Sequence, residues 1–451
     1  MPQMNRRDFL QALGVGAAAL TTGPLAGLAA PATEARGGRS NVILCMADDQ
    51  GWGDVGYNDK ATLLRPNVKT PVLDEMAASG LRLNRFYAAQ SVCSPTRGSV
   101  LTGRHPNRYA CWWPGTPLRT QEMTIAQALK SIGYATGHFG KWHLNGVSGP
   151  GKPIRADDPL NPGRFGFDEW FSVSNYFELD WTFSRKGEPV KTTGDGSDVI
   201  VGEALKFIAQ AARDKKPFLA LVWFGSPHVP IQALSDYRAK AGGDAYCGEI
   251  YGIDHAMGTL RGELRKLGIA DNTLLWYCSD NGATTSAGTG GLRGSKATIW
   301  EGGLRVPGLI EWPARIKKPF VTDVPAVTSD IYPTILDIVG HKVPNQIEPL
   351  DGISVLPMLE GKMTQRPKPI GFWWRRVGKT PSHAALTDNR YKLHKFGDDK
   401  FELYDLADDP GESKDLAAEK PDVVAKMKTV LEAWQESVAN STKGNDYAAK
   451  P

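Results

Sequence analysis

The sequence predicts an α/β fold in which helices sandwich a large, mostly parallel sheet, followed by a smaller C-terminal antiparallel sheet with one helix. Two observations predict it. From residue 40 onwards, short apolar runs alternate with helix-like stretches. Such alternation is typical of parallel sheets with both faces covered by helices. After about Trp312 the sequence pattern changes to closely spaced short strands, which indicates the antiparallel sheet.

Four apolar runs are the strand candidates of the large sheet. They cover residues 41–46, 134–139, 217–224 and 273–278. Two helices are expected between the first two of these runs. In the first helix, Thr70 can cap the start, Pro71 suits the first turn and Gly80 can end it. The second helix is expected over residues 124–132.

The C-terminal part begins with a helix over residues 330–339 and a polar stretch that runs to about Pro369. Short strands are expected at residues 371–374, 383–386, 391–393 and 401–405. A final helix is expected over residues 421–438, because its apolar residues recur at helical spacing. We therefore predict a catalytic α/β domain over residues 38–360 and a C-terminal α+β subdomain over residues 361–451.

The first 35 residues read as an export signal of the twin-arginine type. Arg6 and Arg7 precede an apolar run rich in Ala and Gly, and Ala30-Pro31-Ala32 offers a cleavage site. An ordinary helix and an uncleaved anchor are the alternatives. No later stretch reaches the ~20 apolar residues that a membrane span needs. The mature chain is therefore expected to be periplasmic or secreted in a bacterium, without a stable membrane span.

Composition excludes several classes of protein. The formal charge of +4 over 451 residues is small and is not gathered into basic runs, so no nucleic-acid partner is expected. The five cysteines form no C-x-x-C pair, which argues against a zinc ribbon or a thioredoxin-like site. The pattern leaves open which of the cysteines are free and which are paired.

Polar residues follow each of the four predicted strands. They are Asp48-Asp49, then Lys141 and His143, then His228, then Asp280-Asn281. Ligands of open α/β sheets bind beyond the carboxyl ends of the strands, so these side chains are expected to converge. The oxygen donors Asp48, Asp49, Asp280 and Asn281 suit a hard divalent cation, Ca²⁺ or Mg²⁺, better than zinc or copper.

The segment from Cys93 to Arg104, CSPTRGSVLTGR, is the most specific signal. It resembles the C-x-P-x-R signature and L-T-G-R continuation of the type I sulfatases, in the alkaline-phosphatase-like superfamily. The block from Leu292, the G-K-W-H-L segment and the closing E-L-Y-D-L-x-x-D-P-x-E also resemble that family. Accidental agreement of these ordered segments is very improbable.

The resemblance implies that Cys93 is oxidised to formylglycine by a separate maturation enzyme, and that residue 93 is a further metal ligand. The hydrate of formylglycine is a geminal diol, so one oxygen can attack sulfur and the other can expel sulfate. The resemblance also implies calcium as the metal. Arg97, one helical turn after Cys93, would steady the hydrate.

The remaining catalytic roles are also implied by the resemblance. Lys141 and Lys296 would cradle the sulfate oxygens, where charge is spread during transfer. His143 would act as the base during elimination, and His228 as the acid that protonates the leaving alcohol. Asp280 is a candidate to take the proton of the attacking hydroxyl. Glu301 is interpreted as a structural acid.

The substrate class follows from export and from aromatic residues outside the strands. Trp112-Trp113, Trp181 and Trp373-Trp374 can stack on sugars or aryl rings, although core packing is favoured for Trp374. Arg375-Arg376 can meet further anionic groups. The expected substrate is a sulfated carbohydrate, with aryl sulfates as small analogues. The alternatives are a phosphonate or phosphate ester hydrolase of the same superfamily, or an inactive glycan-binding homologue.

Overall fold

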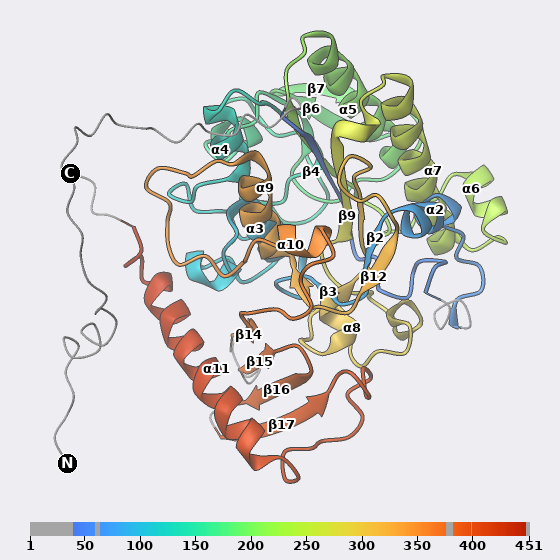
Figure 1. Ribbon diagram of the computed structural model, residues 1–451. Helices are drawn as coiled ribbons and strands as arrows, with labels where there is room; N and C mark the ends of the chain where they lie inside the picture. The colour runs from blue at the N-terminus through green and yellow to red at the C-terminus, as the bar shows by residue number, and fades with distance from the viewer. Residues whose placement is uncertain (1–38, 59–63, 376–381, 398, 448–451) are drawn as a thin grey trace, which may run out of the picture. The chain divides into compact units, whose positions relative to one another are not determined.

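A computed structural model describes residues 39–58, 64–375, 382–397 and 399–447. Its centre is a ten-stranded sheet (Figure 1). From one edge to the other, the strands are β12 (Phe320–Thr322), β2 (Leu81–Leu83), β11 (Gly308–Glu311), β9 (Thr273–Ser279), β1 (Asn41–Ala47), β8 (Phe218–Trp223), β4 (Ala135–Lys141), β5 (Glu169–Val173), β6 (Thr182–Arg185) and β7 (Glu188–Lys191). The predicted export signal at residues 1–35 lies outside the described residues.

The five adjacent strands β9, β1, β8, β4 and β5 are parallel, and four of them, all but β5, are the strands that the sequence predicted. Cys45 of β1, for example, pairs with Val222 on one side and Tyr277 on the other. The outer strands β11, β6 and β7 pair antiparallel with their neighbours, so the complete sheet is mixed. The α/β fold class is confirmed.

Helices cover both faces of the large sheet, and the side chains of β1 alternate between them. Val42 and Leu44 pack into the core below α3 (Cys93–Thr102), α4 (Ile125–Ser131) and α9 (Ile331–Val339). Ile43 and Cys45 pack into a second core. The helices of that second core are α2 (Pro71–Ser79), α5 (Gly196–Arg213) and α7 (Ala245–Lys266). Burial on both faces explains why the central strands read as continuous apolar runs.

Helix boundaries agree with the sequence, with one correction at α2. Thr70 occupies the position before the helix, but its hydroxyl donates to Asp74 Oδ1 at 2.9 Å instead of capping a backbone N–H. In α4, Thr124 and Gln127 form a capping box. Shorter helices are α6 (Ser235–Lys240), α8 (Glu301–Leu304) and α10 (Leu356–Leu359).

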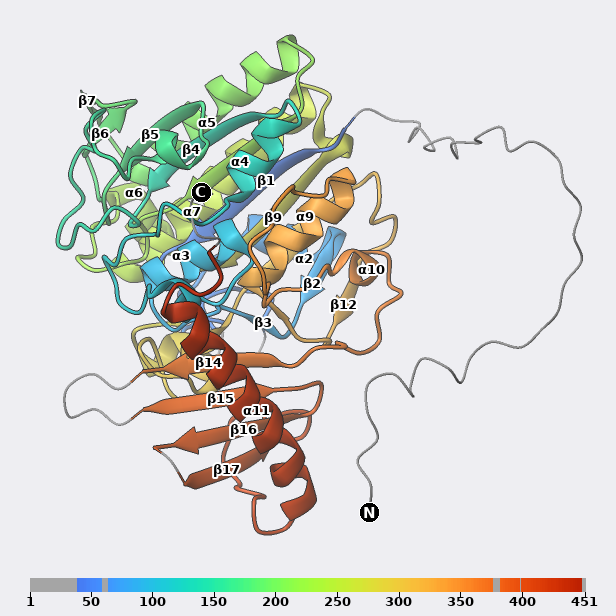
Figure 2. The same cartoon turned by 90° about the vertical axis from the view of Figure 1, so that its left-hand side faces the viewer.

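The C-terminal sheet is antiparallel, as predicted, and α11 (Pro421–Thr442) crosses one of its faces (Figure 2). Its strands are β14 (Ile370–Trp374), β15 (His383–Thr387), β16 (Tyr391–Phe396) and β17 (Lys400–Asp405). Leu393 and Leu403 pack against Met427 and Leu431 of α11. The predicted domain boundary at residue 360 stays a prediction.

The other face of the small sheet packs towards the large domain. There Phe372 contacts Tyr87, with ring centroids 5.8 Å apart, and both belong to one buried cluster. Tyr87 lies in a three-stranded sheet of β10 (Arg305–Val306), β3 (Phe86–Tyr87) and β13 (Ala326–Val327). The small sheet is therefore attached to the catalytic part through a shared apolar core.

All five cysteines are buried free thiols, which answers the pairing that the sequence left open. Cys45 and Cys278 lie in the central strands β1 and β9. No described helix combines the length and the hydrophobicity that a membrane span requires.

Candidate active site

The site lies beyond the carboxyl ends of the parallel strands. Asp48 and Asp49 follow β1, Asp280 and Asn281 follow β9, and Lys141 ends β4. Because β9, β1, β8 and β4 are neighbours in the sheet, their ends meet at one edge. The structure therefore brings together the residues that the sequence placed after separate strands.

Cys93 is the first residue of α3, and every residue of this helix is buried. Its Sγ lies 3.5 Å from Asp48 Oδ1 and 3.6 Å from Lys296 Nζ. The amino end of a helix carries a partial positive charge, which favours an anion beside residue 93. The fixed backbone of α3 thus aims residue 93 at the cluster of acids.

The four predicted metal ligands other than Cys93 are fully buried, and three of them are joined by hydrogen bonds. Asp280 Oδ1 accepts the N–H of Asp49 at 3.1 Å, and Asn281 Nδ2 donates to Asp49 Oδ1 at 2.8 Å. Two oxygens, Asp49 Oδ2 and Asn281 Oδ1, are buried without a hydrogen-bond partner among the described residues. Buried orphan oxygens of this kind are costly unless a cation or water satisfies them.

His228 lies beside these acids, as the sequence predicted, but the sequence did not place it among the potential metal ligands. Potential ligand atoms of Asp48, Asp49, Cys93 and His228 all lie within 4.8 Å of one another. His228 Nε2 is 3.8 Å from Asp49 Oδ2, and its ring stacks on Tyr176 with centroids 4.9 Å apart. The sequence contains no signal for Tyr176, which follows none of the predicted strand ends.

Three basic side chains form ion pairs with the carboxylates of the site. Lys141 Nζ lies 2.5 Å from Asp48 Oδ2, and Lys296 Nζ lies 2.5 Å from Asp49 Oδ1. Arg97 donates to Asp280 Oδ2 at 2.7 Å, and its guanidinium lies over the ring of Trp223. As expected from its spacing, Arg97 is one turn after Cys93 in α3 and faces the same site.

Burial and charge set the protonation of the site. Burial raises the pKa of the Cys93 thiol to about 12, although Lys141 and Lys296 oppose the rise. Burial also lowers the pKa of His143 well below its usual value, so the imidazole is neutral. Both ring nitrogens of His143 lack partners among the described residues, so a lone pair of the neutral ring faces the site, while burial and the neighbouring cations disfavour the protonated form.

Three residues at the site have a left-handed backbone although none is glycine. They are Asp49 (φ 68°), His143 (φ 55°) and Ala297 (φ 68°), the last directly after Lys296. Non-glycine residues adopt this conformation only where the surroundings enforce it, and they gather at functional sites. The tertiary structure therefore imposes the left-handed backbone at these three residues, and no sequence pattern predicted it.

Comparison with known proteins identifies the family. Residues 40–341 match the family model described as Sulfatase, and residues 294–437 match the model described as N-sulphoglucosamine sulphohydrolase, C-terminal. The N-acetylgalactosamine-6-sulfatase of Sus scrofa is 32% identical over 394 residues, covering 78% of this chain and 71% of the relative.

The chain belongs to the sulfatase family. It is therefore a sulfate ester hydrolase, as its sequence predicted. Human (Homo sapiens) arylsulfatase A is 30% identical to this sulfatase over 391 residues, covering 79% of this chain and 75% of the relative. Residues 3–23 match the signal of the twin-arginine translocation pathway, which indicates export across a membrane.

Solved structures share the fold of this sulfatase. The complex of Ps i-CgsB with k-i-k-neocarrahexaose superposes with a TM-score of 0.78 at 27% identity, covering 88% of this chain and 92% of that one. The phosphonate monoester hydrolase of Agrobacterium radiobacter superposes with a TM-score of 0.66 at 20% identity, covering 89% and 96%. The second likeness shows a common fold only.

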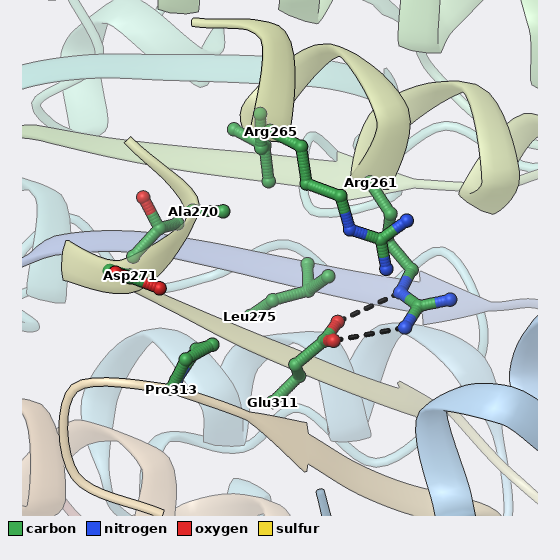
Figure 3. A pocket seen from close by; sticks show the side chains of 9 residues that line it. Arg261, Arg265, Ala270, Asp271, Leu275, Glu311 and Pro313 are labelled. Carbon is green, nitrogen blue, oxygen red and sulfur yellow. Dashed lines mark hydrogen bonds and ion pairs between the residues drawn. The ribbon is translucent and has the colours of Figure 1, made fainter. Parts of the chain in front are cut away.

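A separate cavity of about 130 Å³ lies at the opposite end of β9 (Figure 3). It is lined by Asp271, which precedes β9, and by Arg261 and Glu311, which form a two-pronged pair at 2.8 and 2.9 Å. A strand of seven residues spans roughly 20 Å, so this cavity is remote from Asp280. It has no part in the chemistry at residue 93.

Proposed function

We propose that this sulfatase hydrolyses sulfate esters of carbohydrates after Cys93 has been converted to formylglycine. The observation that carries the proposal is the position of Cys93. It begins a buried helix and lies within 3.6 Å of both an acid, Asp48, and a cation, Lys296. A buried thiol whose pKa is raised to about 12 stays protonated and is a weak nucleophile. The modified residue, as its hydrate, supplies the attacking oxygen and releases sulfate by re-forming the aldehyde.

A divalent cation fits the acids beside residue 93. Asp48, Asp49, Asp280, Asn281 and residue 93 would hold it, and the orphan oxygens of Asp49 and Asn281 support this assignment. Carboxylate and amide oxygens suit Ca²⁺, with Mg²⁺ as the second choice. When bound, the cation would withdraw charge from a sulfate oxygen and orient the nucleophile. His228 is assigned to proton transfer, because imidazole is a poor ligand for a hard cation.

Three positively charged side chains of the protein bind the sulfate group or hold residue 93. Lys141 and Lys296 extend their ammonium groups to the acids beside residue 93, where they can stabilise the charge that spreads over the sulfate oxygens. Arg97 is fixed by Asp280 and steadies residue 93 from the same helix. These three groups sit in a buried site, where electrostatic interactions are stronger than in water.

Two histidines move protons. The neutral ring of His143, which has no hydrogen-bond partner among the described residues, accepts the proton that leaves residue 93 during elimination. Burial lowers the pKa of His143, so its protonated form is short-lived and returns the proton readily. His228 lies at the rim, with its side chain 15% exposed, and donates a proton to the leaving alcohol. Burial lowers the pKa of His228, so its protonated ring is a stronger acid, while Asp48 and Asp49 partly oppose this shift. Asp280 is a candidate to take the proton of the attacking hydroxyl.

Carbohydrate sulfates are the proposed substrate class, and aryl sulfates are expected to serve as analogues. Relatives named for N-acetylgalactosamine-6-sulfate and a neighbour bound to k-i-k-neocarrahexaose support a sulfated sugar. The proposed location is the periplasm or the medium of a bacterium, after removal of the export signal. A formylglycine-generating maturation enzyme is the expected partner.

The test combines peptide mass spectrometry of residue 93 with sulfate release from a panel of sulfated glycans and an aryl sulfate. Protein made together with a formylglycine-generating enzyme should carry the aldehyde and release sulfate, and Cys93→Ala should abolish release. Aldehyde without release from any sulfate ester would redirect attention to phosphonate and phosphate esters. A thiol at position 93 in protein from the native host would favour an inactive glycan-binding protein.

A further inference from the structure

A recess of about 410 Å³ opens beside residue 93. Its lining includes Val92, Trp113, Pro114, Lys296, Ala297 and Trp374. Val92 directly precedes Cys93, and the ammonium of Lys296 lies 3.6 Å from the Cys93 sulfur. The inner end of the recess therefore adjoins the position where a sulfate ester would react, and the leaving group of that ester would extend into it.

Two tryptophans form a wall of this recess. The rings of Trp113 and Trp374 meet edge to face, with centroids 4.8 Å apart and planes at 87°. Both are partly exposed, so one surface of each is available to a ligand. Among the described lining residues, Lys296 is the one with a charged side chain, and Thr284 adds a hydroxyl at the exposed rim. The largest surface offered beyond the sulfate is therefore that of the two indole rings.

The C-terminal sheet delivers Trp374 to the site, and hydrogen bonds to the preceding residue hold it in position. Trp374 ends β14 and packs behind on the apolar cluster that joins the two sheets. The carbonyl of the preceding Trp373 accepts from Gln90 Nε2 at 3.1 Å and from Asn107 Nδ2 at 2.7 Å. Gln90 in turn accepts, through its own carbonyl, a 2.7 Å bond from Thr96 of α3. The wall and the nucleophile are thus attached to one framework.

We propose that Trp113 and Trp374 are specificity-determining residues that bind the uncharged six-membered ring bearing the sulfate ester. This inference rests on the proposed function and names the group that the recess recognises. The C–H face of a pyranose and the face of an aryl ring share the required chemistry, because both stack on indole. Asn107 acts as a positioning residue, since its side chain bonds the carbonyl of Trp373 directly before Trp374.

The test compares two ring substrates with a probe that has no ring. The ring substrates are a monosulfated methyl pyranoside and 4-nitrophenyl sulfate, and the probe is inorganic sulfate as a competitive inhibitor. In Trp374→Ala and Trp113→Ala we expect KM for the ring substrates to rise about tenfold, the value of one good aromatic contact. The inhibition constant of inorganic sulfate should stay within about twofold of wild type, because sulfate alone does not reach the recess.

Conservative and indirect variants separate ring binding from a general structural effect. Trp374→Phe and Trp113→Phe should recover most of the lost affinity, because an aromatic face is retained. Asn107→Ala should raise KM without changing the inhibition constant of sulfate, because it loosens the end of β14 that carries Trp374 and removes no group near residue 93. A rise confined to the pyranoside would identify a sugar as the ligand, and a rise confined to the aryl ester would identify an aryl group.

A binding measurement keeps this inference distinct from the proposed function. In the Cys93→Ala background, calorimetry with the methyl pyranoside sulfate should give a Kd about tenfold higher when Trp374→Ala is added. If wild type releases no sulfate but this difference in Kd is seen, the proposed function fails and the ring site stands. Equal KM and Kd values with and without the tryptophans, or equal rises for the ring substrates and for inorganic sulfate, would overturn the ring site.

Discussion

Lys392 of the small sheet donates a 3.0 Å hydrogen bond to Glu301, which stands five residues after Lys296 in the large domain. The ammonium also lies 3.1 Å from Glu412, and all three side chains are fully buried. Glu301 further accepts from Tyr87 at 3.0 Å. Lys392 of the C-terminal sheet therefore neutralises Glu301, which begins α8 just after the loop that carries Lys296. This agrees with the prediction that Glu301 is a structural residue.

Removing this buried charge should destabilise the protein strongly. Lys392→Met leaves Glu301 and Glu412 buried without their cation, at an expected cost of about 3–5 kcal/mol. Thermal and urea unfolding should show the loss. Lys395→Met is the matched control on the same strand, because the side chain of its partner Glu432 is 41% exposed and solvent-accessible pairs contribute about 1 kcal/mol or less. Equal stability of the two variants would contradict the importance of the buried cluster.

Metal removal should have a thermal as well as a catalytic effect. Chelation should lower the Tm, since Asp48, Asp49 and Asp280 lose the cation that compensates their buried charges. Added Ca²⁺ at about a hundred times its Kd should restore about 2.7 kcal/mol. Differential scanning fluorimetry of Cys93→Ala tests binding without turnover. Asp49→Asn should weaken this response, whereas Asp236→Asn on the exposed helix α6 should leave it unchanged. A Tm that changes neither with chelator nor with added Ca²⁺ or Mg²⁺ would argue against the metal site.

Lys296 should contribute to catalysis through its charge. Lys296→Met removes a cation placed to meet the sulfate oxygens, and kcat should fall by roughly 10²–10³. Steady-state kinetics with 4-nitrophenyl sulfate measure this fall. Lys266→Met is the control, because Lys266 is exposed on α7 and pairs with Glu263 at the surface. A Lys296→Met enzyme with the kcat of the control would remove Lys296 from the mechanism.

Asp351 should make stability depend on pH in the acid range. It pairs with Arg108 at 2.6 and 3.0 Å and accepts from Trp434 Nε1 of α11 at 2.9 Å. Burial would raise the pKa of Asp351, but Arg108 outweighs burial and holds it well below the ordinary value. A depressed pKa in the folded state stabilises the protein above about pH 4, the pKa of an unfolded Asp, and this contribution is lost as pH falls further.

The corresponding measurement is the Tm of wild type and Asp351→Asn between pH 7 and pH 3. At pH 7 the variant should be less stable by about 1.5–3 kcal/mol, since it loses charged hydrogen bonds. The gap should narrow below pH 4. A gap that stays constant over this range would show that the charge of Asp351 does not contribute.

Much of the fold followed from local patterns. The four buried runs of the large sheet, the short strands after Trp312 and the helix at residues 421–438 all appear in the structure near their predicted bounds. Hydrophobic periodicity encodes these elements over a few residues, so a single sequence displays them. The outer strands β12, β2 and β11 on one side of the sheet and β5, β6 and β7 on the other were not predicted, because three to five residues carry little periodic signal.

The sequence by itself determined the chemistry: the motif at Cys93, the acids after β1 and β9, and the basic residues after β4 and β8. Only the tertiary structure decided how these groups meet. It set the left-handed backbone at Asp49, His143 and Ala297, the stacking of Tyr176 on His228, and the contact between Trp113 and Trp374. The physical reason is that these groups are far apart along the chain. Packing of the whole core brings them together, and a local sequence pattern contains no information about that packing.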